Sequence, residues 1–199
     1  MREASPFRLL TVLDTAQREA VLAEVLAQDR HWVGSPVPSL NASRLSLVFA
    51  RSPHWISGPG VSTADARSFG TFAFVPELAG RMDHVQALVL RLQGLLGGSE
   101  HGSVFASRME PGSEVGEHRD GGVYYASYHR CQVCLQAEEG TVFRCGDDSL
   151  VMKPGEVWVF DNTRPHSVRH EGRSERVALV VDIAGPPVAA HLRLSSSRR

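Results

Sequence analysis

The pattern that decides the fold is clearest in residues 154–166, Pro154-Gly155-Glu156-Val157-Trp158-Val159-Phe160-Asp161-Asn162-Thr163-Arg164-Pro165-His166. A Pro-Gly turn marker precedes a short run of β-branched and aromatic residues, and a polar segment ending in proline separates that run from the next one. The same alternation predicts eight short strands: 103–109, 114–118, about 128–137, 141–145, 149–152, 156–161, 166–170 and 175–183. Short strands in this number are typical of a jelly roll, which has an open mouth between its sheets. We therefore predict a mainly β (α+β) fold with a double-stranded β-helix core, jelly-roll or cupin-like, over residues 103–185.

Residues 1–102 are predicted to support this core with helices and strands. One helix is expected from Asp14 or Thr15 to about Gln28, and another from Pro76-Glu77 to about Leu96, where Gly97-Gly98 ends it. Strands are expected at 44–50 and 71–75, and the segment 29–43 is expected to be a loop. Residues 51–70 contain Pro and Gly together with aromatic and basic side chains, so this segment is either a substrate loop or a surface excursion. Residues 186–199 are expected to form a flexible tail of a single domain that comprises residues 1–199.

Composition excludes several classes of protein. The 199 residues carry a formal net charge of -1, which provides no global field for nucleic acid. The run from Leu9 to Leu13 is too short for a signal peptide, and no apolar run has the length needed to span a bilayer. We therefore expect a cytoplasmic protein without nucleic-acid or membrane partners; its oligomeric state is left open.

The three cysteines, Cys131, Cys134 and Cys145, are too few for a disulfide framework. The first two have the CxxC spacing, but they lie in a predicted strand. Because side chains three positions apart in a strand point to opposite faces, joint metal ligation or redox pairing is not expected.

His118 and Asp120 are two residues apart at the end of a predicted strand, so both side chains point to the same face. His166 begins a later strand, directly after a turn, and is the candidate for a third ligand. Two imidazoles and one carboxylate on one face of an octahedral ion are the ligand set of non-haem Fe(II) oxygenases, and leave positions open for a co-substrate and dioxygen. Zinc is the alternative ion, although structural zinc sites prefer four protein ligands.

Arg176 stands ten residues after His166, beyond a turn at 171–173. If this segment is a hairpin, His166 and Arg176 lie on neighbouring strands, and Arg176 can pair a carboxylate bidentately in the same cavity. Taken singly, each of these side chains has an ordinary explanation, such as a solvated histidine or a surface ion pair. The combination of triad and arginine predicts an iron site with a co-substrate pocket.

Residues 103–183 resemble the aspartyl/asparaginyl β-hydroxylase family of Fe(II)- and 2-oxoglutarate-dependent dioxygenases. The bacterial free-proline hydroxylases are also similar, since they share the His-x-Asp pair and the later His. The matching segments are Met109-Glu-Pro-Gly112 with Val115, His118-Arg-Asp120, Tyr128-His-Arg130, Pro154-Gly-Glu-Val-Trp-Val-Phe-Asp-Asn-Thr163, His166-Ser-Val168 and Arg176 before Leu179-Val-Val-Asp182.

The resemblance implies roles for four further residues. Arg176 is expected to bind the distal carboxylate of 2-oxoglutarate together with Ser107, and Arg130 is expected to line the co-substrate pocket. Gln132 stands where the family has His; its amide can donate a hydrogen bond but adds no positive charge. Animal members have Gly where Asp120 stands, so this chain has the full triad, which argues against a halogenase.

The resemblance also implies a reaction that consumes O2 and converts 2-oxoglutarate to succinate and CO2 while an aliphatic C–H bond is hydroxylated. The substrate is expected to be an amino acid or amino-acid residue (the β-carbon of Asp or Asn, or a proline-like ring), free, carrier-tethered or peptidyl. Candidates for holding a substrate carboxylate are Arg119, Arg67, Arg51 and Arg164. The alternatives are a cupin-like metal-binding module without oxygenase activity and a sugar-binding jelly roll, which would display exposed aromatic side chains.

Overall fold

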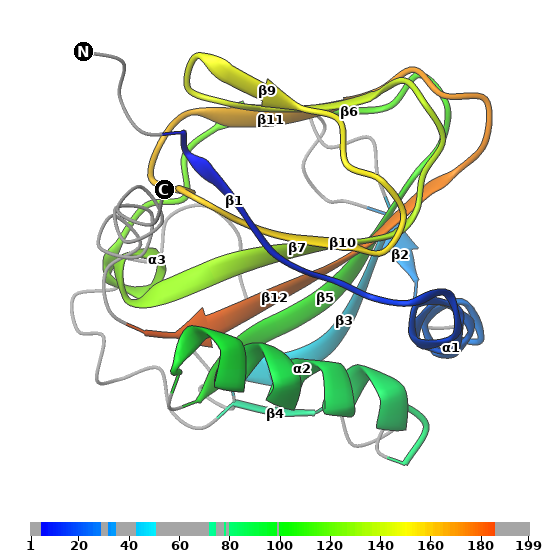
Figure 1. Cartoon of the computed structure of the whole chain (residues 1–199), viewed down its shortest axis with the longest axis vertical. Coiled ribbons are helices and arrows are strands. Elements are labelled where there is room, and N and C mark those ends of the chain that lie inside the picture. The colour runs from blue at the N-terminus through cyan, green and yellow to red at the C-terminus, as the bar shows by residue number, and fades with distance from the viewer. Residues whose placement is uncertain are drawn as a thin grey trace.

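The computed structural model describes residues 5–28, 32–34, 43–50, 72–74, 78, 80–98 and 100–185. The predicted substrate loop 51–70 and the predicted tail 186–199 lie outside these residues. Two helices, α1 (Thr15–Leu26) and α2 (Asp83–Leu96), cover one face of a large sheet, and a smaller sheet lies on its other side (Figure 1). The remaining elements are β1 (Phe7–Val12), β2 (Val33–Gly34), β3 (Ser43–Ala50), β4 (Phe72–Phe74), β5 (His101–Met109), β6 (Glu114–His118), α3 (Val123–Ser127), β7 (Tyr128–Gln136), β8 (Thr141–Cys145), β9 (Asp148–Leu150), β10 (Glu156–Phe160), β11 (His166–His170) and β12 (Arg176–Ala184).

The strand order confirms the predicted double-stranded β-helix. The large sheet has the order β1-β10-β7-β12-β5-β3-β2, with β4 paired to β3, and the small sheet has the order β6-β11-β8-β9. All of these pairs are antiparallel. From β5 onward, successive strands alternate between the two sheets, except β8 and β9, which pair with each other in the small sheet. Among the described residues, no helix has both the length and the apolar character needed to cross a membrane.

The eight strands predicted from residue 103 onward correspond to β5 to β12, with ends that differ by at most two residues. Four elements differ from the prediction. Residues 33–34, inside the predicted loop 29–43, form strand β2, which pairs with β3. Residues 7–12 form strand β1 instead of an isolated apolar run, and α3 follows the turn at Gly121-Gly122. Helix α2 begins at Asp83, not at residue 77, because Gly80 has a φ of 75°, a left-handed conformation that an α-helix cannot contain.

The main core lies between the helices and the large sheet. Alternation along β12 directs Val177, Leu179, Val181 and Ile183 toward the helices, where α2 contributes a stripe that includes Leu88 and Leu92. The other residues of β12 face the small sheet. A second, smaller cluster fills part of the space between the sheets, and its buried members are Met109, Cys134, Phe143, Cys145, Met152, Phe160 and Val168.

The cysteines have the predicted arrangement. Cys131 belongs to the main core and Cys134 to the cluster between the sheets, so the two thiols point to opposite faces of β7. All three cysteines are free and buried. Burial raises the pKa of Cys131 to about 12, of Cys134 to about 11 and of Cys145 to about 12, which keeps the thiols protonated.

The predicted hairpin between His166 and Arg176 is wrong. Strand β11 pairs with β6 and β8 in the small sheet, whereas β12 pairs with β5 and β7 in the large sheet. The turn at 171–173 therefore carries the chain from one sheet to the other. Both residues nevertheless point into the space between the sheets, since Arg176 has the same parity on β12 as Ala178, and His166 the same parity on β11 as the buried Val168.

Candidate metal and co-substrate site

The structure brings His118, Asp120 and His166 together. His118 ends β6 and His166 begins β11, and the two residues stand directly opposite each other in the antiparallel register. Their ring centroids are 4.2 Å apart. The backbone N–H of Asp120 donates to the carbonyl of Asn162 at 3.1 Å, which holds the residue beside the end of β10. One side-chain ligand atom from each of the three residues lies within 4.8 Å of the other two.

Backbone carbonyls orient both imidazoles. His118 Nδ1 lies 2.8 Å from the Gly116 carbonyl oxygen, and His166 Nδ1 lies 2.9 Å from the Arg164 carbonyl oxygen. Because a carbonyl only accepts, each Nδ1 carries the proton and each Nε2 presents a lone pair. The Nε2 atoms lie 4.0 Å from Asp120 Oδ1 and 3.9 Å from Asp120 Oδ2, respectively. Burial lowers the pKa of His166, which favours the neutral imidazole that a metal requires.

Asp120 is held by a network of buried side chains. Arg130 Nη1 donates to Asp120 Oδ2 at 2.8 Å, and Asn162 Nδ2 donates to the same oxygen at 3.3 Å. The other side of the guanidinium pairs with Asp182, with Nε to Oδ1 and Nη2 to Oδ2 both at 2.8 Å. Burial alone would lower the pKa of Arg130, but Asp182 and Asp120 outweigh it and raise this pKa well above the ordinary value.

Arg176 has a very different environment from Arg130. Its side chain is only 3% exposed, and its donors meet Met109 Sδ at 3.6 Å and Gln132 Oε1 at 3.5 Å. Within the described part of the chain, no carboxylate pairs with it. Desolvation by burial therefore lowers the pKa of Arg176. A buried guanidinium with two weak neutral acceptors is suited to binding a carboxylate ligand.

The four predicted co-substrate residues share one face of the large sheet. On β12, Arg176 is opposite Met109, and Ala178 is opposite Ser107. On the other side of β12, Val180 is opposite Gln132 and Asp182 is opposite Arg130. Directly opposed residues of antiparallel strands point to the same side, so all of these side chains face the small sheet, as the triad requires.

Comparison with known proteins agrees with this geometry. The family model described as aspartyl/asparaginyl beta-hydroxylase matches residues 71–186. The chain belongs to this family. A search of curated proteins found no match.

Solved structures with the same fold include several hydroxylases. A Pseudomonas putida prolyl-4-hydroxylase is 14% identical with a TM-score of 0.61, and the match covers 90% of this chain and 91% of that one. A prolyl hydroxylase from Trichoplax adhaerens, in complex with a hypoxia inducible factor oxygen degradation domain peptide fragment, is 11% identical with a TM-score of 0.63 and coverage of 98% and 88%. A Burkholderia pseudomallei oxidoreductase of the 2OG-Fe(II) oxygenase family is 17% identical with a TM-score of 0.57 and coverage of 83% and 81%. At these identities the matches show a shared fold.

The predicted substrate-binding arginines of this β-hydroxylase family member are less closely gathered than the co-substrate residues. Arg119 is exposed, and Arg164 forms an ion pair with Asp161 at 3.2 Å. Arg51 and Arg67 lie outside the described residues. Asp161 also accepts hydrogen bonds from the backbone and hydroxyl of Thr163, which shape the turn before His166.

Asp182, Tyr124 and Asn162 were not predicted as site residues from the sequence, although their side chains join the hydrogen-bond network around Arg130 and Asp120. Asp182 is completely buried in an otherwise apolar strand, and Tyr124 Oη donates to its Oδ2 at 2.9 Å. An acidic residue inside an apolar run is a detectable signal, because burying a carboxylate requires a partner. The identity of the partners depends on the sheet register, which the sequence does not display.

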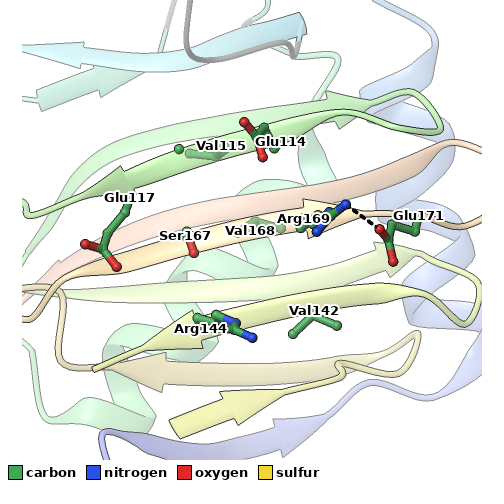
Figure 2. Close-up of a pocket in the computed structure, with 10 residues that line it drawn as sticks. Glu114, Val115, Glu117, Val142, Arg144, Ser167, Val168, Arg169 and Glu171 are labelled. Carbon is green, nitrogen blue, oxygen red and sulfur yellow. Dashed lines mark ion pairs between the residues drawn. The ribbon is translucent and has the colours of Figure 1, made fainter. Parts of the chain in front are cut away.

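A separate groove of about 470 Å³ lies on the outer face of the small sheet (Figure 2). Arg144 and Arg169 alternate along their strands with residues that face the core between the sheets, so the groove is on the opposite side from that core. Its charged side chains are of both signs, and Arg169 pairs with Glu171 at 2.7 Å. Asp120, His166 and Arg176 lie on the inner side of the sheets, away from this groove.

Proposed function

We propose that this protein is an Fe(II)- and 2-oxoglutarate-dependent dioxygenase that hydroxylates an aliphatic C–H bond of an amino acid or amino-acid residue and releases succinate and CO2. One observation carries the proposal: the His118, Asp120, His166 cluster and the buried Arg176, which has no carboxylate partner among the described residues, face the same space between the two sheets.

The donor set fits Fe(II). His118, Asp120 and His166 would hold the ion through two neutral imidazoles and one carboxylate, and would leave other positions open. When bound, iron supplies the oxidation by O2 that is coupled to decarboxylation of 2-oxoglutarate. The protein would orient the reactants and exclude water around them. The first residues of β11 and β12, His166 and Arg176, are buried and face this space.

Arg176 and Ser107 are proposed to hold the distal carboxylate of 2-oxoglutarate. A carboxylate would give Arg176 the charged partner that Met109 and Gln132 do not provide, through a bidentate charge-assisted pair. Gln132 accepts from Arg176, so in this chain its amide helps to orient the guanidinium where other family members place a histidine.

The two alternative functions are disfavoured by specific observations. A metal-binding module without oxygenase activity has no use for a buried cation on the metal-facing side of the sheet, and such a cation costs stability. A sugar-binding jelly roll would display aromatic platforms. Among the described residues, the exposed large hydrophobic side chains are all aliphatic: Leu9, Val12, Leu90, Leu95 and Val151.

The family and the fold neighbours support the proposed substrate class. The family description names aspartyl and asparaginyl residues, and two of the neighbours are described as prolyl hydroxylases, one of them bound to a peptide fragment. We propose an amino acid, free, carrier-tethered or peptidyl, with Arg119, Arg164, Arg51 and Arg67 as the candidates for its carboxylate. Three free, buried cysteines support a reducing compartment such as the cytoplasm.

The direct test is succinate formation from 2-oxoglutarate with Fe(II), under aerobic and anaerobic conditions, across a panel of Asp-, Asn- and Pro-containing peptides and free amino acids. Oxygen-dependent succinate and a hydroxylated product, detected by mass spectrometry, are expected. If no succinate forms on any substrate, with or without coupling, and 2-oxoglutarate does not bind in a metal-dependent way, the proposal is wrong.

A further inference from the structure

We propose that Arg130 and Asp182 are positioning residues for the metal ligand Asp120, and that the co-substrate carboxylate is left to Arg176. This inference rests on the proposed function and deepens it. It also reassigns Arg130, which the family resemblance places in the co-substrate pocket.

Asp182 fixes the guanidinium of Arg130 in a single orientation. The carboxylate is fully buried and accepts from Nε and Nη2, both at 2.8 Å, which is a bidentate pair. Asp182 is itself fixed, because Tyr124 Oη donates to it at 2.9 Å and accepts from the backbone N–H of Ser103 at 2.8 Å. With one edge of the guanidinium held in this way, Nη1 points to Asp120.

The contact at Asp120 leaves one carboxylate oxygen for the metal. Oδ2 accepts from Arg130 Nη1 at 2.8 Å and from Asn162 Nδ2 at 3.3 Å, whereas Oδ1 receives no hydrogen bond from the described residues and faces His118 Nε2 at 4.0 Å. The two donors therefore fix the rotation of the carboxylate about its long axis. A metal ligand oriented by outer hydrogen bonds binds its ion more tightly than one that must be ordered on binding.

Charge balance explains why Asp182 is required. A guanidinium 2.8 Å from a metal ligand would repel a divalent cation at close range in a poorly solvated site. Asp182 supplies a buried negative charge on the other edge of Arg130, so the pair orients Asp120 without adding net positive charge beside the ion.

The contrast between the two buried arginines divides their roles. Arg130 has two carboxylate partners and lies against the rings of Tyr125 and Phe105, at 4.8 and 5.7 Å from their centroids. Arg176, on the same face of the sheet, has only neutral acceptors among the described residues. Arg176, which has no charged partner among the described residues, is suited to binding a ligand carboxylate. Arg130, which is already paired with two carboxylates, is suited to holding Asp120 in place.

The test measures metal binding and co-substrate binding separately. Mn(II) binding is followed by the electron paramagnetic resonance signal of free Mn(II) in the absence of 2-oxoglutarate, and 2-oxoglutarate binding is then measured at saturating Mn(II). The variants are Arg130→Lys, which cannot bridge both carboxylates, and Asp182→Asn, which leaves the charge of Arg130 uncompensated. The matched control is Arg108→Lys, because Arg108 also pairs with a carboxylate, Glu175 at 2.9 Å, from the opposite face of the same sheet.

Both site variants are expected to raise the Kd for Mn(II) by about 10–100-fold, the effect of removing an outer-sphere partner of a metal ligand. Their Kd for 2-oxoglutarate at saturating Mn(II) should equal that of the wild type, and Arg108→Lys should change neither constant. An altered spectrum of bound Co(II) in Arg130→Lys would show a changed ligand geometry, which a purely structural role would not produce.

Other outcomes overturn the inference in identifiable ways. If Arg130→Lys weakens 2-oxoglutarate binding and leaves the Kd for Mn(II) unchanged, Arg130 is a co-substrate contact as the resemblance implies. If only the melting temperature falls, the pair is structural. If a single variant fails to fold, the double variant Arg130→Gln/Asp182→Asn removes both charges together. Its Kd values for Mn(II) and for 2-oxoglutarate are then compared with those of the wild type. Failure of the wild type to bind Mn(II) or 2-oxoglutarate would instead count against the proposed function.

Discussion

His166 and Arg176 are ten residues apart in the chain, yet they lie in different sheets. Both side chains point into the space between the two sheets, from opposite sides. His166 begins β11 beside His118, and Arg176 begins β12 opposite Met109. The crossing between the sheets therefore places the proposed metal ligand His166 on one wall and, on the other, Arg176, which has only neutral acceptors among the described residues. A hairpin would have placed both on one wall, with no depth for a dicarboxylate between them.

His166→Ala is expected to abolish succinate formation, because the remaining two side chains cannot form the three-ligand set. Metal-dependent stabilisation should be lost as well. A ligand that binds only the folded state at a concentration 100-fold above its Kd stabilises that state by about 2.7 kcal/mol. The measurement is the melting temperature with Mn(II) and with a chelator, beside a succinate assay.

His84→Ala is the control for that experiment. His84 is exposed on α2 and takes no part in the cluster, so its variant should retain the rise in melting temperature on adding Mn(II). A His166→Ala protein that still gains stability from the metal and produces succinate would show that His166 is not a ligand.

Arg176→Met should produce opposite effects on stability and on binding. The methionine is apolar, of similar length and next to Met109, so it removes a buried cation that has only neutral acceptors among the described residues. The free energy of unfolding of the ligand-free protein should rise, on the order of 1–4 kcal/mol, as when buried charges are replaced by well-packed apolar side chains. The Kd for 2-oxoglutarate should rise roughly 30-fold to several thousand-fold, equivalent to about 2–5 kcal/mol.

Urea unfolding and a 2-oxoglutarate titration of the same preparations test both effects. Arg108→Met supplies the comparison, because that half-exposed arginine has a carboxylate partner and faces away from the site. If Arg176→Met is less stable than the wild type and binds 2-oxoglutarate equally well, Arg176 is a structural residue.

The sequence predicted that His118, Asp120 and His166 would lie together, because the signals for this cluster are local. His118 and Asp120 share a strand face through the period of two, and turn markers defined β11 so that His166 stood at its start. Strand β1 was missed for the opposite reason. Residues 7–12 become a strand by pairing with β10, and that partner is nearly 150 residues away in the chain.

The partners of individual side chains also depended on distant residues. The resemblance predicted a pocket position for Arg130 but not its partner: the sheet register aligns Arg130 with Asp182, a residue 52 positions later. Similarly, the turn at 171–173 has the local sequence of a hairpin. The chain crosses from the small sheet to the large sheet at this turn because β11 and β12 pair with strands of different sheets, which the local sequence does not show.

The native protein should resist thiol modification. Burial raises the pKa of Cys134 to about 11, three units above pH 8, so only about one molecule in a thousand carries that thiolate at pH 8. An unfolded cysteine has a pKa of about 8.5 and is partly ionised at that pH. Iodoacetamide labelling at pH 8 should therefore be slow in buffer and should reach three thiols per chain in urea. The unfolded thiols ionise above about pH 8.5 while the buried ones stay protonated, which favours the unfolded state. The free energy of unfolding should therefore fall as the pH rises above about 8.5.

The labelling result also bears on the CxxC spacing. Fast native labelling of a single cysteine would contradict the burial. Formation of a disulfide between Cys131 and Cys134 under mild oxidation would contradict their placement on opposite faces of β7.

Gly102→Ala should destabilise the fold and disturb the network that anchors Asp182. An added Cβ at Gly102 would lie 2.3 Å from Tyr124 Oη and 2.7 Å from Tyr128 Cε1, closer than these atoms can approach. Tyr124 is almost fully buried and donates to Asp182, so it cannot withdraw without breaking that hydrogen bond. Overpacking of this kind typically costs about 1–3 kcal/mol.

Gly94→Ala is the matched control. Apart from its chain neighbours and the backbone of α2, no atom of the described residues lies within 4 Å of the Cβ added at Gly94. As an exposed position inside α2, it should gain about 0.5–1 kcal/mol of stability. Urea unfolding of both variants gives the sign directly, and equal stabilities would show that Tyr124 is not held against β5.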